Sequence, residues 1–294
     1  MAGLDTEATA REDAPKVMDA RPRLEVSYGG PRRWPRGGVT ALDGRAESPL
    51  HYQLGACTHM GRARAGNEDH FVVWKPPRRA DSAIERLLLA VADGMGGHAA
   101  GARASHLATD ALVNSLHAAG ADASNEDALV SGFAAANSRI LEYQSADAST
   151  RGMGTTLVAA TLEGRDLAVA SIGDSRCYLL RRGELRQITS DHTVAGAMLA
   201  ERADGDEPSA AEDSALAHQL TRCVGIDARE GPPDVFHEEL EPGDSLLLAS
   251  DGLTGPVPRG EIARIMDEGA GPWETARALV EAALEAGGPD NITA

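Results

Sequence analysis

The stretch LLLAVADG at residues 87–94 decides the fold, and LLLASDG at residues 246–252 repeats its design. Each is a continuous apolar run, which predicts a buried β-strand, and each ends in an aspartate followed by a glycine. The glycine lets the backbone turn sharply or approach a ligand closely. An ionised aspartate at the end of a buried strand is costly unless a cation or hydrogen bonds compensate it. Two such strand ends, brought together, would form a site for a hard cation.

Further oxygen-bearing side chains could join that site. Asn67, Glu68 and Asp69 stand near the start of the patterned region, and Asp290 and Asn291 stand near its end. Oxygen-only ligation is typical of Mg²⁺ or Mn²⁺ rather than of zinc. The alternative interpretation is that the Asp-Gly pairs are ordinary turns, which this dipeptide forms readily.

The order of the expected elements favours one fold class. Strands and helices occur in blocks rather than in strict alternation, which predicts an α+β fold with packed sheets rather than a doubly wound sheet. Arg182-Gly183 predicts a hairpin turn, and Asn125 is the expected cap of the second helix. The pattern predicts helices over 99–116, 125–144, 260–268 and 273–286, and strands over 87–92, 155–162, 167–172, 177–181, 184–188, 235–240 and 246–250.

The composition narrows the classes of partner. The chain has 294 residues and a formal net charge of −17. Nucleic acids and anionic membranes both need a basic surface, so neither is expected as a partner. No apolar run is long enough to span a membrane and the first residues do not read as a secretory signal, so we expect a cytoplasmic protein. The three cysteines lie far apart in sequence and show no metal-binding or redox spacing.

Two segments differ from the rest of the chain. Residues 1–50 have balanced charges and alternate prolines with glycines, which predicts a disordered leader before a domain over 51–294. Residues 191–219 are polar and rich in alanine, which predicts short helices in a mobile insert.

Three other phosphate-binding motifs match the sequence only in part or not at all. GMGGHA at residues 94–99 nearly matches a dinucleotide fingerprint, but the strand and helix order expected of that fold is missing downstream. Arg62 follows Cys57 one position too early for the loop of cysteine phosphatases, and no Gly-Lys-Ser/Thr of a P-loop occurs.

Six stretches together resemble the metal-dependent Ser/Thr protein phosphatases of type 2C, the PPM family, in its bacterial form. The resemblance covers residues 51–294 and implies two packed antiparallel β-sheets, a β-sandwich, flanked by α-helices in four layers, α-β-β-α. It also implies a site for two Mn²⁺ or Mg²⁺ ions at one edge. The stretches, in the order of the family, are RAGNED at 64–69, ADGMGGH at 92–98, GMGTT at 152–156, IGDSR at 172–176, SDGL at 250–253 and GPDNIT at 288–293.

The resemblance assigns the metal ligands. Asp93 would bridge both ions, and the Gly94 carbonyl would complete the shell of one. Asp251 and Asp290 would bind the other ion. Two adjacent cations lower the pKa of a bridging water, so that hydroxide attacks phosphorus in line at neutral pH.

The resemblance also assigns the residues around the ions. Glu68 and Asp69 would hold metal-bound waters, and Arg64 would bind the phosphate of the substrate. A planar guanidinium suits that task because it stays charged and can form paired hydrogen bonds to phosphoryl oxygens.

Some positions depart from the family pattern. Met95 stands where eukaryotic members have a histidine, so a metal-bound water is the expected proton donor to the leaving group. Ser149 stands where bacterial members usually have an aspartate, which speaks against a third ion. The chain stops at Ala294, where the family continues into an apolar strand, so we expect that strand to be truncated. His98 and the polar residues of 173–176 are interpreted as structural.

The resemblance implies a protein serine/threonine phosphatase that opposes Ser/Thr kinases. Its expected partners are proteins phosphorylated on Ser or Thr, a Ser/Thr kinase among them, and we expect a monomer. The insert that begins at Asp191-His192-Thr193 would lie beside the active site and influence the choice of substrate. Two alternatives stay open: a regulator that dephosphorylates one dedicated partner, and a pseudophosphatase that binds without catalysis.

Overall fold

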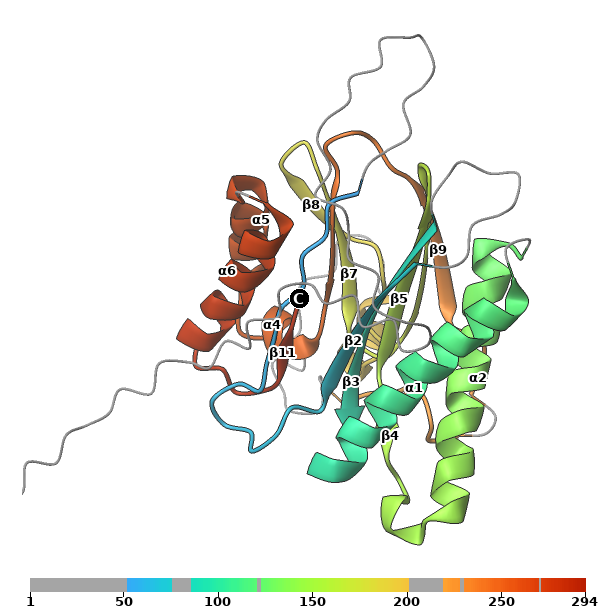
Figure 1. The fold of residues 1–294 in the computed structure, drawn as a ribbon. Helices are drawn as coiled ribbons and strands as arrows, with labels where there is room; N and C mark the ends of the chain where they lie inside the picture. Colours follow the sequence, from blue (N-terminus) through green and yellow to red (C-terminus); the bar gives the residue numbers. More distant parts are fainter. Residues whose placement is uncertain (1–51, 76–85, 121–122, 201–218, 228–229, 270) are drawn as a thin grey trace, which may run out of the picture.

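Two antiparallel β-sheets lie face to face, and a pair of helices covers the outer side of each sheet (Figure 1). The computed structural model describes residues 52–75, 86–120, 123–200, 219–227, 230–269 and 271–294. The expected leader over 1–50 lies outside these described residues. The four layers α-β-β-α confirm the predicted fold class.

The first sheet has the strand order β2-β3-β5-β6-β9, and a short strand, β4, also pairs with β3. The strand predicted over 155–162 is in fact two strands, with Thr156 between them. The strands are β2 (Asp69–Trp74), β3 (Arg86–Met95), β4 (Gly154–Thr155), β5 (Leu157–Glu163), β6 (Asp166–Ile172) and β9 (Asp234–Glu239).

The second sheet has the order β10-β7-β8, with strands β7 (Arg176–Arg181), β8 (Glu184–Gln187) and β10 (Ser245–Ala249). The predicted hairpin joins β7 to β8. Arg182 and Gly183 both have positive φ, 55° and 80°, as a two-residue hairpin turn matching the strand twist requires.

A pair of two-residue strands lies beside the sheets. Strand β1 (Thr58–His59) pairs antiparallel with β11 (Ile292–Thr293). The final residue, Ala294, exchanges two backbone hydrogen bonds with Cys57, of 2.8 and 2.9 Å. The two ends of the described domain are therefore tied to each other.

Helices α1 (His98–Ala119) and α2 (Asn125–Ala146) cover the first sheet, and α5 (Arg259–Glu268) and α6 (Pro272–Glu285) cover the second. The expected cap of α2 at Asn125 is wrong by one residue. The Ser124 hydroxyl accepts the Asp127 N–H, because Ser124 has the extended backbone of a cap and Asn125 is already helical. Among the described helices none is both long and apolar enough to cross a membrane.

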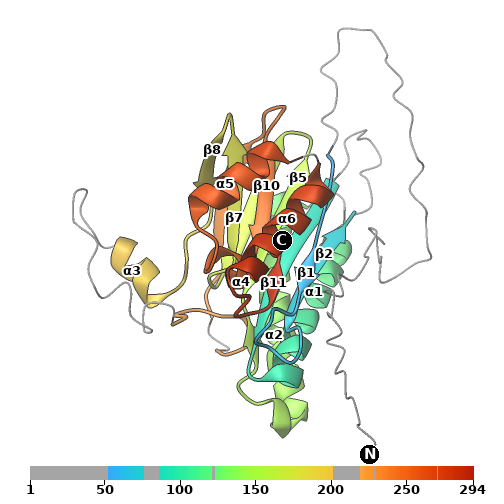
Figure 2. The same ribbon diagram turned by 90° about the vertical axis from the view of Figure 1, so that its left-hand side faces the viewer.

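Two shorter helices complete the fold. Helix α4 (Asp251–Thr254) follows β10 directly. Helix α3 (Val194–Ala200) belongs to the expected insert and stands apart from the body of the sandwich (Figure 2). Residues 201–218 of that insert lie outside the described residues.

Three apolar layers hold the sandwich together. Strand β3 contributes side chains to two of them. Leu88, Ala90 and Ala92 pack toward α1 and α2, while Leu87 and Val91 pack between the sheets. Because both faces of the strand are buried, the usual alternation of apolar and polar residues is absent. The third layer lies between the second sheet and α5 and α6.

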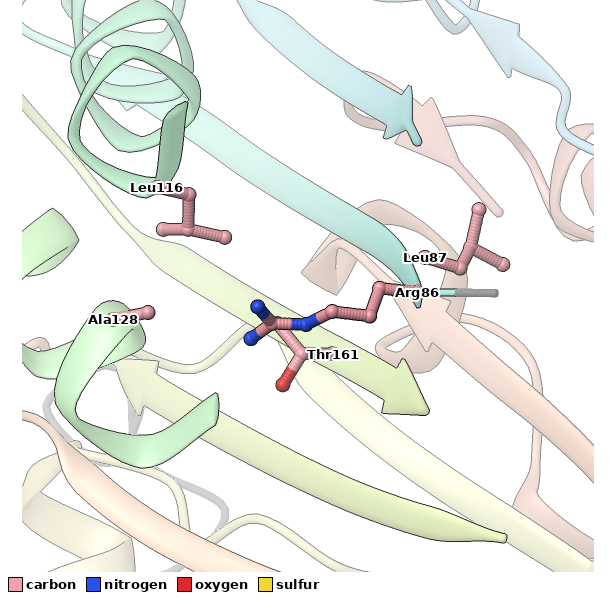
Figure 3. Close-up of a pocket in the computed structure, with 5 residues that line it drawn as sticks. All are labelled: Arg86, Leu87, Leu116, Ala128 and Thr161. Atoms are coloured by element: carbon pink, nitrogen blue, oxygen red, sulfur yellow. The ribbon is translucent and has the colours of Figure 1, made fainter. Parts of the chain in front are cut away.

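A small cavity lies at the end of β3 that is far from Asp93. Figure 3 shows the Arg86 guanidinium extending toward Thr161 and Ala128 in this cavity. Its volume of about 10 Å³ is close to the space that one water needs. Arg86 also forms an ion pair of 3.3 Å with Glu163, so this cavity is part of the packing and not of a substrate site.

The stability of the first sheet can be tested at Ser171. Its side chain is fully buried in β6, and its hydroxyl has no hydrogen-bond partner among the described residues. We expect Ser171→Ala to raise the free energy of unfolding by about 1 kcal/mol, because it removes a desolvated, unsatisfied group. Guanidinium unfolding measures the change.

The matched control is Ser105→Ala, at a second fully buried serine. The Ser105 hydroxyl donates to the Glu68 carbonyl at 2.6 Å. This replacement should lower the free energy of unfolding by about 1 kcal/mol. Equal destabilisation by both replacements would contradict the prediction.

Candidate active site

Aspartates remote in the sequence meet at one edge of the sandwich. Asp69 begins β2 and lies opposite Asp93 in the register of β3. Asp251 begins α4 directly after β10, and Asp290 precedes β11. The charges of Asp69 and Asp251 act on Asp93, and the charges of Asp251 and Asp290 act on Asp69. The structure therefore brings the four predicted aspartates together.

Asp93 and Asp251 interact directly. Burial raises the pKa of Asp93 well above its ordinary value, and the negative charges of Asp69 and Asp251 raise it further. Burial also raises the pKa of Asp251, whose carboxylate shares a hydrogen bond with Asp93. The pair can share one proton, because two like charges this close oppose each other's ionisation.

Asp69 is held by hydroxyl groups on one side only. Its Oδ2 accepts hydrogen bonds from Ser250 Oγ and Thr293 Oγ1, both at 2.7 Å. Burial raises its pKa to about 7 against the effect of these two bonds. Its Oδ1 and the Oδ1 of Asp251 are buried without a hydrogen-bond partner in the described part of the chain. Unpartnered buried carboxylate oxygens fit the ligands of a cation.

Glu68 is buried beside Asp69, and its backbone is fixed by three contacts. Its N–H donates to Asn291 Oδ1 at 2.8 Å, and its carbonyl accepts from Ser105 Oγ and from the Gly94 N–H. Gly94 is required by close packing, since a Cβ there would lie 2.1 Å from the Gly101 carbonyl oxygen.

The two asparagines expected as possible ligands are used for structure. Asn291 Oδ1 is occupied by the Glu68 N–H, and its amide donates to the carbonyls of Met60 and Gly66. Asn67 Oδ1 accepts the Asp69 N–H at 3.2 Å. In this structure these amides position the acidic residues, and each of the two oxygens accepts a backbone N–H.

Arg64 lies at the exposed side of the acidic cluster. Its Nη2 donates to Asp290 Oδ2 at 2.6 Å, with 43% of the arginine side chain exposed. This hydrogen bond raises the pKa of Arg64, and the charges of Glu68 and Asp93 also act on it. One donor of the guanidinium is engaged by Asp290, so the planar group keeps further donors for an anion.

The donor set fits a hard divalent cation in its chemistry. It consists of carboxylate and carbonyl oxygens, which Mg²⁺ and Mn²⁺ prefer. As the side chains lie, the described residues contain no group of three His, Cys, Asp or Glu that closes around one ion. In the absence of such closure, the Asp93–Asp251 hydrogen bond and the Arg64–Asp290 ion pair offset part of the repulsion among the carboxylates.

Two threonines hold Asp93 in place. The Asp93 N–H donates to Thr156 Oγ1 at 3.0 Å, and its carbonyl accepts from the Thr156 N–H and from Thr155 Oγ1. Thr156 Oγ1 also lies 2.7 Å from Ser175 Oγ. The GMGTT stretch thus positions the backbone of Asp93, a role that the sequence analysis did not assign.

Asp174 is a further member of the cluster. Burial raises its pKa to about 7, and the charges of Asp251 and Asp191 add to this rise. The sequence predicts a structural role for the polar residues of 173–176. That description fits Ser175 and Arg176, but Asp174 lies among the acidic residues. Its signal in the sequence was the same as that of Asp93: an aspartate just after an apolar strand.

Other residues named in the sequence analysis, Ser149, Met95 and His98, do not add to the acidic cluster of the described residues. Asp147 accepts hydrogen bonds from the backbone and hydroxyl of Ser149 in a 3-10 turn, Ala148–Thr150, at the protein surface. Met95 ends β3 and pairs with Gly154. The side chain of His98 lies outside the described part of the chain. The dinucleotide alternative is wrong, because the neighbours of β3 are antiparallel.

Comparison with known proteins identifies the family. The family model for protein phosphatase 2C matches residues 54–292. The serine/threonine protein phosphatase PstP of Mycobacterium tuberculosis is 37% identical over 254 residues, which cover 84% of this chain and 45% of PstP. The serine/threonine phosphatase stp of Listeria innocua is 34% identical, over 80% of this chain and 91% of stp.

A solved structure of a family member also matches this chain. The catalytic domain of PstP in complex with two manganese ions has a TM-score of 0.67 and 38% identity, covering 81% of this chain and 94% of that domain. An α-β-β-α sandwich with an acidic edge is the architecture that the resemblance implied. The chain belongs to the protein phosphatase 2C family. It spans about half of the length of the curated PstP relative.

The pKa of Asp174 predicts how stability depends on pH in metal-free protein. A folded-state pKa raised from 3.8 to about 7 gives a stabilising contribution below pH 4 that is lost as the pH rises through 7. Asp174→Asn should therefore raise the free energy of unfolding at pH 7.5 by about 2 kcal/mol in EDTA. The gain should shrink as the pH falls and should vanish below the unfolded-state pKa of 3.8, where the wild-type carboxyl is protonated in both states.

Denaturant unfolding of wild type and variant at several pH values tests this expectation. The control is Asp267→Asn on the exposed side of α5, which should change stability little at any pH. A gain from Asp174→Asn that is independent of pH would contradict it.

Proposed function

We propose that this chain is a metal-dependent protein phosphatase that hydrolyses phosphoserine and phosphothreonine. The observation that carries the proposal is the acidic cluster, in which the buried Oδ1 atoms of Asp69 and Asp251 have no hydrogen-bond partner among the described residues. Arg64 stands beside that cluster with an exposed guanidinium. Membership in the protein phosphatase 2C family and the names of the bacterial relatives support the same activity.

The proposed cofactor is a pair of Mn²⁺ or Mg²⁺ ions, with a third ion not required. Asp93, the Gly94 carbonyl, Asp251 and Asp290 would hold the ions directly. The two manganese ions in the PstP catalytic domain support this choice. When bound, such ions supply a water of lowered pKa as nucleophile and positive charge against the phosphoryl oxygens.

Glu68 and Asp69 hold water at the site rather than the ions themselves. Asp69 suits this role, because Ser250 and Thr293 fix its Oδ2 while its Oδ1 stays available. The carboxyl group is thereby oriented before any ligand arrives, which lowers the reorganisation needed during reaction.

Arg64 binds the phosphate of the substrate. Its hydrogen bond to Asp290 keeps the guanidinium at the exposed side of the cluster, and the other N–H groups of the guanidinium can bind an anion. The charge of the guanidinium persists throughout the pH range of the reaction and offsets charge on the phosphoryl oxygens. The thioether of Met95 cannot donate a proton to the leaving alkoxide.

The proposed substrates are proteins phosphorylated on serine or threonine, a Ser/Thr kinase among them. A dedicated regulator of one partner is the second candidate within the family. A pseudophosphatase is less favoured, because the aspartates and Arg64 are all present and lie together at one edge. The cytoplasmic location and the monomeric state stay predictions from the sequence.

Hydrolysis of p-nitrophenyl phosphate and of a phosphothreonine peptide tests the activity. We expect turnover with Mn²⁺ and its loss in EDTA. Asp251→Asn should lower kcat at least 100-fold, because it removes a charge from the metal site, whereas Asp267→Asn should not. Activity that persists in EDTA would contradict a metal mechanism, and a lack of activity on every substrate would favour the pseudophosphatase.

The role of Arg64 predicts a separate pattern. Arg64→Ala should lower kcat/KM for p-nitrophenyl phosphate about 100-fold, and Arg64→Lys should recover only part of it, since an ammonium cannot form paired bonds to phosphate. Arg139→Ala, at an exposed arginine of α2, is the control. Steady-state kinetics with equal Mn²⁺ decide the outcome. Full activity of Arg64→Lys would show that charge alone is sufficient.

A further inference from the structure

His192 forms three hydrogen bonds where the 191–219 insert leaves the domain, and its ring Nε2 faces the charged side chains of Asp234 and Arg222. Its backbone N–H donates to the Gly173 carbonyl at 2.9 Å, and its backbone carbonyl accepts from the Thr221 N–H at 2.8 Å. Its ring Nδ1 accepts the Gly173 N–H at 3.0 Å. Its ring Nε2 lies 3.2 Å from Asp234 Oδ2. One residue thus joins both ends of the insert to Gly173.

These contacts orient the imidazole ring. Nδ1 accepts a hydrogen bond from the Gly173 N–H, so Nδ1 has no proton of its own. Nε2 lies 3.2 Å from Asp234 Oδ2 and 3.3 Å from Arg222 Nη1. Arg222 holds Asp234 in turn, through a hydrogen bond of 2.9 Å from Nη1 to Oδ1. The ring is oriented from both sides.

The backbone of Gly173 has little freedom for a different reason. Its φ is +107°, and a Cβ at this position would lie 2.6 Å from Thr156 Cβ. Thr156 is the residue that accepts the Asp93 N–H. The turn therefore packs directly on a residue that positions the acidic cluster, and the next residue along the chain is Asp174.

We propose that His192 is a positioning residue of the active site, which holds the Gly173–Asp174 turn in register with Asp93 and Asp251 through its Nδ1 acceptor. This inference rests on the proposed function, because it concerns the same metal site. The inference goes beyond the proposed function, because it makes the base of the insert part of the support for the acidic cluster.

A neighbouring ion pair strengthens the same connection. Arg176 binds Asp191 with both oxygens of the carboxylate engaged, at 2.6 to 3.0 Å. Gln187 Nε2 also donates to Asp191 Oδ1. Asp191, the residue before His192, is therefore bonded to Arg176 of β7 and to Gln187 of β8. A displacement of residues 191 and 192 would thus also move the turn that precedes β7.

Two replacements separate the contacts of the ring. His192→Asn places Oδ1 where Nδ1 was, so it keeps an acceptor for the Gly173 N–H and loses the contact with Asp234. His192→Gln places its amide near Asp234 and lacks an acceptor at the Nδ1 position. The two variants have the same chemistry and differ in which contact they retain. His237→Gln, at an exposed histidine of β9, is the control.

The experiment measures Mn²⁺ binding by calorimetry and kcat and KM for p-nitrophenyl phosphate, with thermal unfolding as a check of the fold. We expect His192→Gln to weaken Mn²⁺ binding about tenfold and to lower kcat. His192→Asn should stay within about twofold of wild type, because the Gly173 bond is retained. His237→Gln should resemble wild type in each measurement.

Each other result overturns the inference. Wild-type Mn²⁺ affinity in His192→Gln, or equal losses in both variants, would show that the Gly173 contact does not position the site. A wild type that binds no Mn²⁺ would do the same. If the wild type binds Mn²⁺ with the expected ranking of variants but hydrolyses no phosphate ester, the proposed function fails while the inference on His192 stands.

Discussion

The mutual repulsion of buried carboxylates is the constraint on which this structure depends. Asp69, Asp93, Asp174 and Asp251 lie within reach of each other's charge, and burial raises the pKa of all four. Such a cluster weakens the fold at neutral pH unless protons, hydrogen bonds or cations compensate it. The surrounding residues supply part of that compensation, and the arrangement leaves buried carboxylate oxygens available for a ligand.

The polar residues around the cluster act mainly by fixing backbone. Asn291 bonds to three residues of the 60–68 stretch through one amide group, and Thr156 fixes the backbone of Asp93 on both sides. These contacts are short and satisfied, as buried polar groups in a folded protein normally are. In the sequence these motifs look like a set of ligands. In the structure the acidic groups form the site, and the amide and hydroxyl groups orient the backbone of those acidic residues.

The elements that could be predicted most reliably from the sequence are those whose structure depends on their own residues. Strands β3 and β10 are buried apolar runs, and α2 has a clear apolar stripe, so their existence followed from the pattern. Strands β1 and β11 have two residues each, and nothing local predicts their pairing. Asp174 gave a signal similar to that of Asp93, and the tertiary structure shows that its neighbours in the cluster are remote in the chain.

The position of the cluster across the sandwich explains why the fold must be rigid there. Asp93 follows a strand of the first sheet, Asp251 follows a strand of the second, and Asp174 stands in the connection from β6 to β7. Their separation is thus set by the packing of the two sheets, through Val91, Val158 and other residues between them. Close-packed interiors resist such displacement. The apolar layer between the sheets consequently determines the geometry of a polar site at its edge.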